Sequence, residues 1–246
     1  TSRKSDVVAA AKLGDALPNV DFIMSLCCSQ NVPQMVMPLH DLQAMLENTV
    51  KPIISYDYGI DANYLINMAS SVVGGREELR KQPLLCLYSE PISPLIHDEK
   101  FIRNLRAFAE ARLPCVDIPS AMSGSTAPVT IAGALVQSNA ECLSGNVITQ
   151  LTSKGAPFIY GMDTTVMDMK SSIFAYGAPE WMILNLLEAQ LARRYGLPVW
   201  STGGVSDSKI LDAQALAEAS FTLYTAALSG AHLIHDLGFL DSGLTG

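Results

Sequence analysis

Acidic and aromatic side chains recur at the points where apolar runs of this sequence end. The carboxylates are Asp57, Glu90, Asp163 and Asp236. The aromatic residues are Tyr56, Tyr58, Tyr88, Tyr160 and Trp200, and Phe174 and Tyr176 lie in the loop after Tyr160. Aromatic faces and carboxylates together suit a quaternary ammonium ion, which has no N–H to donate and is held by π electrons and charge. Ordinary packing accounts equally well for any single ring. The whole set predicts a site for a small organic cation.

Two loops contain further candidate binding residues. The stretch YSEPISPL at 88–95 contains two prolines, which make a rigid loop that suits a fixed position for Glu90; a solvated loop carboxylate is the alternative. The stretch MSGSTAP at 122–128 contains Ser123 and Gly124, whose small size lets a ligand approach backbone N–H groups at the start of the next helix. Such a helix start suits an anion, here the carboxylate of a substrate. A Gly/Ser loop by itself is a weak signal.

The histidines and cysteines do not predict a metal site. His232 and His235 are the only histidines close in sequence, and in a strand they would face opposite sides. A zinc site would need ligands from several strands, such as His235 with Cys86 or Cys115, and nothing in the spacing requires it. The chain also lacks the G-x-S-x-G motif of serine hydrolases.

Composition excludes several classes of protein. The chain has 246 residues, 49% of them hydrophobic, with mean hydropathy +0.24, yet no stretch approaches the ~20 apolar residues of a membrane span. The net charge of −8 argues against a nucleic-acid partner, which selects a basic surface. The cysteines form no C-x-x-C pair and no secretory signal precedes them, which predicts reduced thiols in the cytoplasm.

The chain repeats the order of apolar run, turn and helical segment. Strands are expected at residues 22–26, 52–56, 84–89, 115–119, 157–161, 198–202 and 233–237. Helices are expected at 41–48, 63–73, 99–111, 128–151, 179–195 and 212–229, and residues 2–17 form an opening helix that no strand precedes. Asp61 and Asp98 suit helix N-caps, Pro179 suits a first helical turn, and Gly196 suits the position after a helix.

This alternation predicts an α/β fold, either an open doubly wound sheet or a closed barrel. An open sheet usually has a glycine-rich phosphate loop after its first strand, and no such loop is present. We therefore expect a (β/α)₈ (TIM) barrel, with residues 1–246 as a single domain that lacks at least one βα unit. In such barrels the chemistry lies at the carboxyl ends of the strands.

Several motifs of the chain resemble the trimethylamine methyltransferase family. They occur in the expected order over nearly the whole chain and include YGAPE at 176–180 and LSGAHLIHD at 228–236. The others are at residues 16–19, 88–95, 122–135, 155–161, 168–169, 195–198, 206–209, 212–214 and 242–245.

The resemblance implies a barrel enzyme that moves a methyl group from an amine to the Co(I) of a corrinoid carried by a partner protein. Family members are considerably longer than this chain. The archaeal trimethylamine enzymes carry pyrrolysine, whereas this chain has standard residues only, like the branch that demethylates quaternary amines such as glycine betaine. A quaternary ammonium expels a neutral amine, so positioning and desolvation matter more than an acid or a metal.

Strand-end position then suggests roles within this family. The catalytic candidates are His235, Asp236 and Glu90. The substrate-binding candidates are Tyr88, Tyr160, Asp163, Phe174, Tyr176, Trp200, Thr202, Ser123 and Gly124.

Two alternatives stay open. One is a metal-assisted lyase or aldolase that uses His235 and a strand-end carboxylate, and the other is a sensor that binds betaine without catalysis. The sequence does not identify the amine or the corrinoid partner, and it leaves the oligomeric state open, a homo-oligomer included.

Overall fold

The computed structural model describes residues 1–56 and 58–241. Two features singled out from the sequence, the carboxylate Asp57 and the motif at 242–245, lie outside the described residues. The chain divides into two compact units. Unit 1 consists of Thr1–Ser89, Asp98–Val116 and Val147–Pro157, and unit 2 consists of Glu90–His97, Asp117–Asn146 and Phe158–Gly246.

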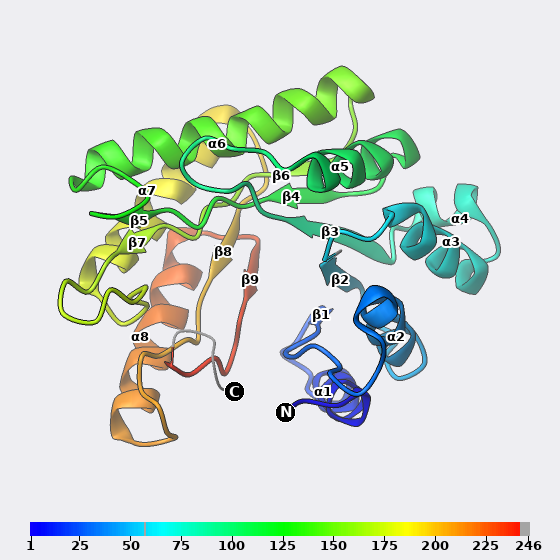
Figure 1. Cartoon of the computed structure of the whole chain (residues 1–246), viewed down its shortest axis with the longest axis horizontal. Helices are drawn as coiled ribbons and strands as arrows, with labels where there is room; N and C mark the ends of the chain where they lie inside the picture. The colour runs from blue at the N-terminus through cyan, green and yellow to red at the C-terminus, as the bar shows by residue number, and fades with distance from the viewer. Residues whose placement is uncertain (57, 242–246) are drawn as a thin grey trace. The chain divides into compact units, whose positions relative to one another are not determined.

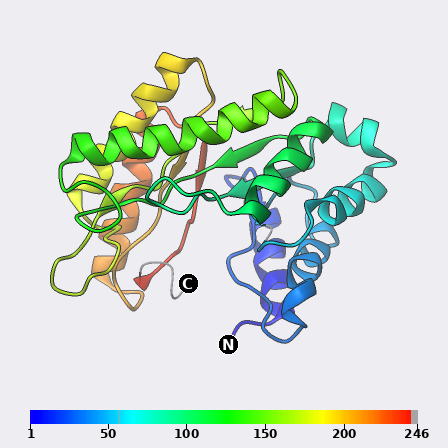
Figure 2. The ribbon, with the colours of Figure 1, turned by 45° about the horizontal axis from the view of Figure 1, so that its top comes forward.

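Unit 1 is built from parallel strands with helices between them. Its strands are β1 (Ile23–Met24), β2 (Ile53–Tyr56), β3 (Leu85–Ser89) and the start of β4 (Cys115–Asp117), and its helices are α1 (Lys4–Ala16), the short 3₁₀ helix η1 (Gln34–Val36), α2 (Met37–Leu46), α3 (Ala62–Val73), α4 (Arg76–Lys81) and α5 (Glu99–Ala111). In the register of β2 and β3, Tyr56 lies opposite Tyr88. Figure 1 shows α2 beside α3, and Figure 2 shows α1 beside α2.

Burial on both faces explains why the strands of unit 1 are apolar runs without alternation. All five residues of β3 are buried, as are the first three of β2. Parallel strands covered by helices on both sides have this pattern. Helix α5 shows the complementary one, since Leu105, Phe108 and Ala109 bury a single stripe at spacings of three and four residues.

Unit 2 contains the later strands and helices. Its strands are β5 (Met122–Ser123), β6 (Phe158–Ile159), β7 (Thr165–Val166), β8 (Trp200–Thr202) and β9 (Leu233–His235). Its helices are α7 (Pro179–Tyr195) and α8 (Ala213–Ser229), and α6 (Ile131–Thr152) contributes residues to both units. Strands β8 and β9 run parallel, with Thr202 opposite His235, and lie side by side in Figure 1. Tyr160 bridges to Val199, at the start of the β8 segment.

The predicted α/β class with parallel strands is confirmed, and every expected strand and helix is present; the helices at 99–111 and 179–195 have the expected ends, and the ends of the other elements differ by a few residues. Asp61 and Asp98 accept hydrogen bonds from N–H groups of the helices they precede. Pro179 opens α7, and Gly196 ends it with a φ of 67°. Within residues 1–56 and 58–241 no closed barrel is found among the strands. In the same part of the chain, no helix is both long and apolar enough to cross a membrane.

Candidate functional site

Asp163 lies among aromatic side chains of unit 2. Its side chain is 4% exposed; Oδ2 accepts a hydrogen bond of 3.0 Å from the hydroxyl of Tyr176, and Oδ1 accepts one of 3.3 Å from Nε1 of Trp181. The ring centres of Tyr176 and Trp181 are 5.6 Å apart, and those of Phe174 and Tyr176 are 4.9 Å apart. A buried carboxylate is therefore held by two neutral donors inside an aromatic group.

His235, at the end of β9, is fixed at both ring nitrogens. Its Nε2 lies 2.6 Å from Oγ1 of Thr202, which the register of β8 and β9 places directly opposite. Its Nδ1 lies 2.9 Å from Oδ1 of Asp236, a residue with a φ of 68°. This left-handed conformation is uncommon outside glycine and occurs often at sites where a side chain must be re-aimed. Trp200 packs on the imidazole with ring centres 4.8 Å apart.

The loops after β8 and β9 stay paired beyond the strands. The N–H of Gly203 donates to the carbonyl of His235 at 3.1 Å, and that of Gly238 donates to the carbonyl of Gly204 at 2.9 Å. Gly204 has a φ of 79°, and a Cβ there would lie 2.4 Å from the side chain of Leu237. The close approach of the two loops therefore requires glycine at this position.

The ionisable groups of the site act on one another. Burial, followed by the charge of Asp236, raises the pKa of Asp163 to about 7, although His235 and the hydrogen bond from Tyr176 oppose the rise and Glu90 adds to it. For His235, burial acts to lower the pKa, but Asp236, Asp163 and Glu90 together outweigh burial and raise it. The site thus combines three carboxyl groups with one imidazole, an excess of acidic groups that favours a cationic ligand.

The proline-containing loop that carries Glu90 is held by a residue that the sequence did not suggest. Glu141, which is 1% exposed on α6, accepts hydrogen bonds from Oγ of Ser93 at 2.6 Å and from the N–H of Leu95 at 2.9 Å. Ser120 Oγ donates to Oε1 of Glu90 at 3.5 Å. The rigidity of the loop therefore depends on Glu141 as well as on the prolines.

Other predicted binding residues are deeply packed. Tyr160 and Trp200 are fully buried, and the hydroxyl of Tyr160 donates to Oδ1 of Asn139 at 2.6 Å. Ser123 is also buried, and the N–H of Gly124 donates to the carbonyl of Ala127 at 3.1 Å. Tyr88 belongs to unit 1, where its ring packs against Tyr56 with centres 5.8 Å apart. The rings of Tyr160, Trp200 and Tyr88 are therefore all buried, and none has a face open to a ligand.

Trp181 and Asp207 contribute to the site without having been predicted. Asp207 accepts hydrogen bonds from the N–H groups of Tyr176, at 2.9 Å, and Gly177, at 2.8 Å. A Cβ on Gly177 would lie 2.7 Å from the carboxyl carbon of Glu218, so a larger residue there would have to displace that side chain. Asp207 lies within a motif of the family resemblance, at 206–209, but its type gave no hint of a role in holding Tyr176.

Metal-binding side chains do not cluster in the part of the chain that the structure describes. No group of three or more histidine, cysteine, aspartate or glutamate residues there could hold a metal ion. The chemistry that the arrangement supports is the binding and orientation of a small cation.

Known proteins resemble the chain along most or all of its length. Trimethylamine methyltransferase MttB of Desulfitobacterium hafniense is 38% identical over 246 residues, which are 100% of this chain and 49% of that protein. MttB of Methanosarcina barkeri is 35% identical over 247 residues, which cover 99% of this chain and 50% of that protein. A glycine betaine methyltransferase of D. hafniense is 35% identical over 214 residues, 86% of this chain and 45% of that protein.

The chain spans about half the length of the curated relatives it matches. A family model described as trimethylamine methyltransferase (MTTB) matches residues 1–246. The chain therefore belongs to the trimethylamine methyltransferase family.

Proposed function

We propose that the protein is a methyltransferase that moves a methyl group from a small quaternary or tertiary amine, such as glycine betaine, to the Co(I) of a corrinoid protein. The observation that carries this proposal is the buried carboxyl of Asp163, which accepts hydrogen bonds from Tyr176 and Trp181 within an aromatic group. A methylated ammonium ion is stabilised by that combination of negative charge and π electrons. The names of the relatives, trimethylamine and glycine betaine methyltransferases, support the amine substrate.

The corrinoid is the methyl acceptor, carried by a partner protein, and it supplies a strong nucleophile. Both ring nitrogens of His235 lie within 3 Å of side chains of this chain, at 2.6 Å and 2.9 Å, so His235 fits an orienting role better than that of a cobalt ligand. The residues of this chain bind the amine, aim its methyl group and exclude water.

The transfer breaks one C–N bond of the amine, whose electron pair stays on the nitrogen while the methyl group passes to the acceptor. A quaternary ammonium leaves as a neutral amine and needs no proton. Desolvation among buried aromatic rings favours the transfer, because charge is neutralised as the bond breaks. A tertiary amine needs a proton on nitrogen before it can leave, and Asp163, with a pKa of about 7, is the group suited to hold one nearby.

The proposal extends to the fold. The parallel strands, the intervening helices and the position of the carboxyl groups at strand ends support a (β/α)₈ barrel, of which this chain forms a part.

Methyl transfer can be measured with free cobalamin in place of the partner. The purified protein is incubated with Co(I) cobalamin and, separately, glycine betaine, carnitine, choline and trimethylamine, while the absorbance of methylcobalamin is followed. We expect one quaternary or tertiary amine to give turnover and Asp163→Asn to reduce it. If no amine gives methylcobalamin, the proposal is refuted.

Two further measurements separate the rival functions. A lyase or aldolase would hold a stoichiometric divalent metal in the purified protein, which elemental analysis detects. A sensor would bind glycine betaine in calorimetry and give no methylcobalamin.

A further inference from the structure

One face of α7 holds the carboxyl ends of two strand segments. Trp181, Asn185 and Glu188 are spaced by four and three residues and therefore share that face. Trp181 donates to the side chain of Asp163, and Nδ2 of Asn185 donates to the carbonyl of Thr202 at 3.4 Å. Glu188 Oε1 accepts the hydrogen bond of the N–H of Met162 at 2.5 Å. The backbone directly before Asp163 is thus fixed by an acidic side chain from a helix.

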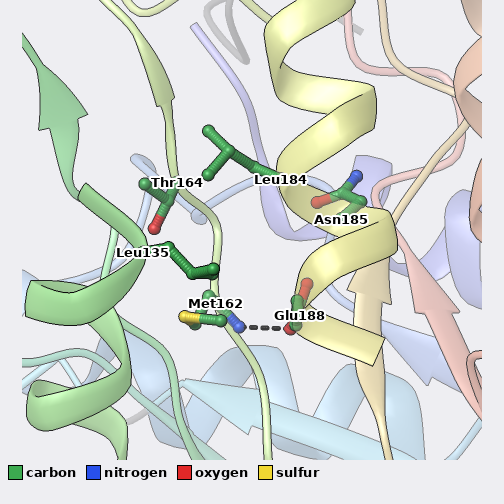
Figure 3. Close-up of a pocket in the computed structure, with 6 residues that line it drawn as sticks. All are labelled: Leu135, Met162, Thr164, Leu184, Asn185 and Glu188. Carbon is green, nitrogen blue, oxygen red and sulfur yellow. Dashed lines mark hydrogen bonds between the residues drawn. The ribbon is translucent and has the colours of Figure 1, made fainter. Parts of the chain in front are cut away.

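Glu188 is enclosed in a pocket without room for water. The pocket is lined by Leu135 of α6, by Leu184 and Asn185 of α7, and by Met162 and Thr164 of the segment between β6 and β7. Figure 3 shows Glu188 on α7 with its dashed hydrogen bond to Met162, and Leu135 on the helix that faces it. The side chain is 1% exposed, and its Oε2 has no hydrogen-bond partner among the residues that the structure describes.

A charge is unfavourable at this position. Burial first, and then the carboxyl of Asp163, hold the pKa of Glu188 well above its usual range, while the hydrogen bond from Met162 opposes the shift. The neutral form of Glu188 is therefore favoured, and its Oε1 accepts the hydrogen bond from the N–H of Met162. As a neutral group it adds no repulsion against an ionised Asp163.

We propose that Glu188 is a positioning residue, which acts as an uncharged acceptor for the N–H of Met162 and thereby keeps Asp163 in contact with Tyr176 and Trp181. Without the acceptor, a buried N–H is left without a partner and the segment must shift to satisfy it. Asp163 follows in sequence and moves with the segment. The expected effect of Glu188 on methyl transfer rests on the proposed function, whereas its effect on the position of Asp163 does not.

The two tryptophans of the chain, Trp181 and Trp200, allow a test that does not need activity. In a Trp200→Phe background, the fluorescence of Trp181 reports on Asp163, to which it donates a hydrogen bond. A pH titration should show a transition near 7, set by Asp163 and by the groups that act on it, namely Asp236, His235, Tyr176 and Glu90. The transition should disappear in Asp163→Asn.

Three variants in that background distinguish the roles of Glu188. Glu188→Gln keeps an acceptor oxygen without charge, and we expect its midpoint to stay within about 0.2 pH unit of the parent. Glu188→Leu has no acceptor, and we expect a midpoint at least about 0.5 pH unit higher, because Asp163 loses its donors. Leu135→Ala takes volume from the opposite wall of the pocket without removing a hydrogen bond and should leave the midpoint unchanged.

Two results would overturn the proposal. A lower midpoint in Glu188→Gln would mean that the native side chain is ionised, and a parental midpoint in folded Glu188→Leu would mean that the acceptor is not needed. If Glu188→Leu does not fold, the midpoint of Glu188→Gln still tests whether the native side chain is uncharged. In methyl transfer, we expect Glu188→Leu to lower kcat/KM about tenfold and Glu188→Gln to restore it. A wild-type protein without methyl transfer would refute the proposed function and leave the fluorescence result standing.

Discussion

Tyr176→Phe offers a direct measure of how the aromatic group controls the charge of Asp163. The substitution removes the hydroxyl that donates to Oδ2 of Asp163 at 3.0 Å and keeps the ring that packs on Phe174 and Trp181. A hydrogen bond to a charged group contributes about 1.5 to 3 kcal/mol. Since about 1.36 kcal/mol corresponds to one pH unit, the pKa of Asp163 should rise by about one to two pH units.

The expected effect on binding follows from the ionised fraction of Asp163. With a pKa of about 7, Asp163 is half ionised in the wild type at pH 7. A rise of about one to two pH units lowers that fraction about fivefold to fiftyfold, and binding of a quaternary ammonium should weaken in proportion. At pH 9 about half to nine-tenths of the carboxyl would be ionised again, so at least about half of the affinity should return.

Calorimetric titration with glycine betaine from pH 5.5 to pH 9.5 measures the effect for both proteins. The binding curve of Tyr176→Phe should lie on the alkaline side of the wild-type curve, with a similar plateau. Superimposed curves, or a shift to the acid side, would refute the reasoning that Tyr176 stabilises the ionised carboxylate.

Three further predictions concern stability. Between pH 4 and pH 8, Asp163→Asn should become more stable than the wild type by up to about 4 kcal/mol. The wild type loses stability as pH rises toward and through the folded-state pKa of Asp163, about 7, because the carboxyl ionises more easily in the unfolded chain. Urea unfolding at a series of pH values tests this, and a difference in unfolding free energy that does not change with pH would contradict it. Asp207→Ala should lose about 1 to 3 kcal/mol in the same assay, because the N–H groups of Tyr176 and Gly177 lose their acceptor. Gly177→Ala should lower the melting temperature, because its Cβ would clash with the side chain of Glu218 on α8. An unchanged melting temperature would show that the Glu218 side chain can move away without destabilising the protein.

Much of the fold was predictable because its strands are buried on both faces. Continuous apolar runs such as residues 84–89 stand out, and Asp61 and Asp98 mark helix starts through a direct hydrogen bond. Helix α4 was missed because Leu79 is its only buried residue, so no apolar period exists to detect. Strands β5 and β7 were also missed: each has two residues, one of them polar, and no apolar run marks them, whereas the equally short β1 and β6 lie within apolar runs.

The residues of the candidate site that lie at the ends of strands were predictable from the sequence. Asp163 follows the β6 segment, whereas His235 ends β9 and Asp236 comes directly after it, and the structure brings their charges within reach of one another. The contributions of α7 were not predictable, because a helical pattern does not reveal which polar side chains turn inward. In the sequence, nothing distinguishes Trp181 and Glu188 from other helix residues, because their contacts with the strand ends appear only in the structure.

The continued pairing of the loops after β8 and β9 limits how the site can respond to a ligand. Thr202 and His235 are bonded through their side chains, and the loops that follow them are bonded through Gly203, Gly204 and Gly238. A displacement of either loop must therefore break these hydrogen bonds or move the other loop with it. Under the proposed function, amines of different size would then have to be accommodated by side chains other than Thr202 and His235.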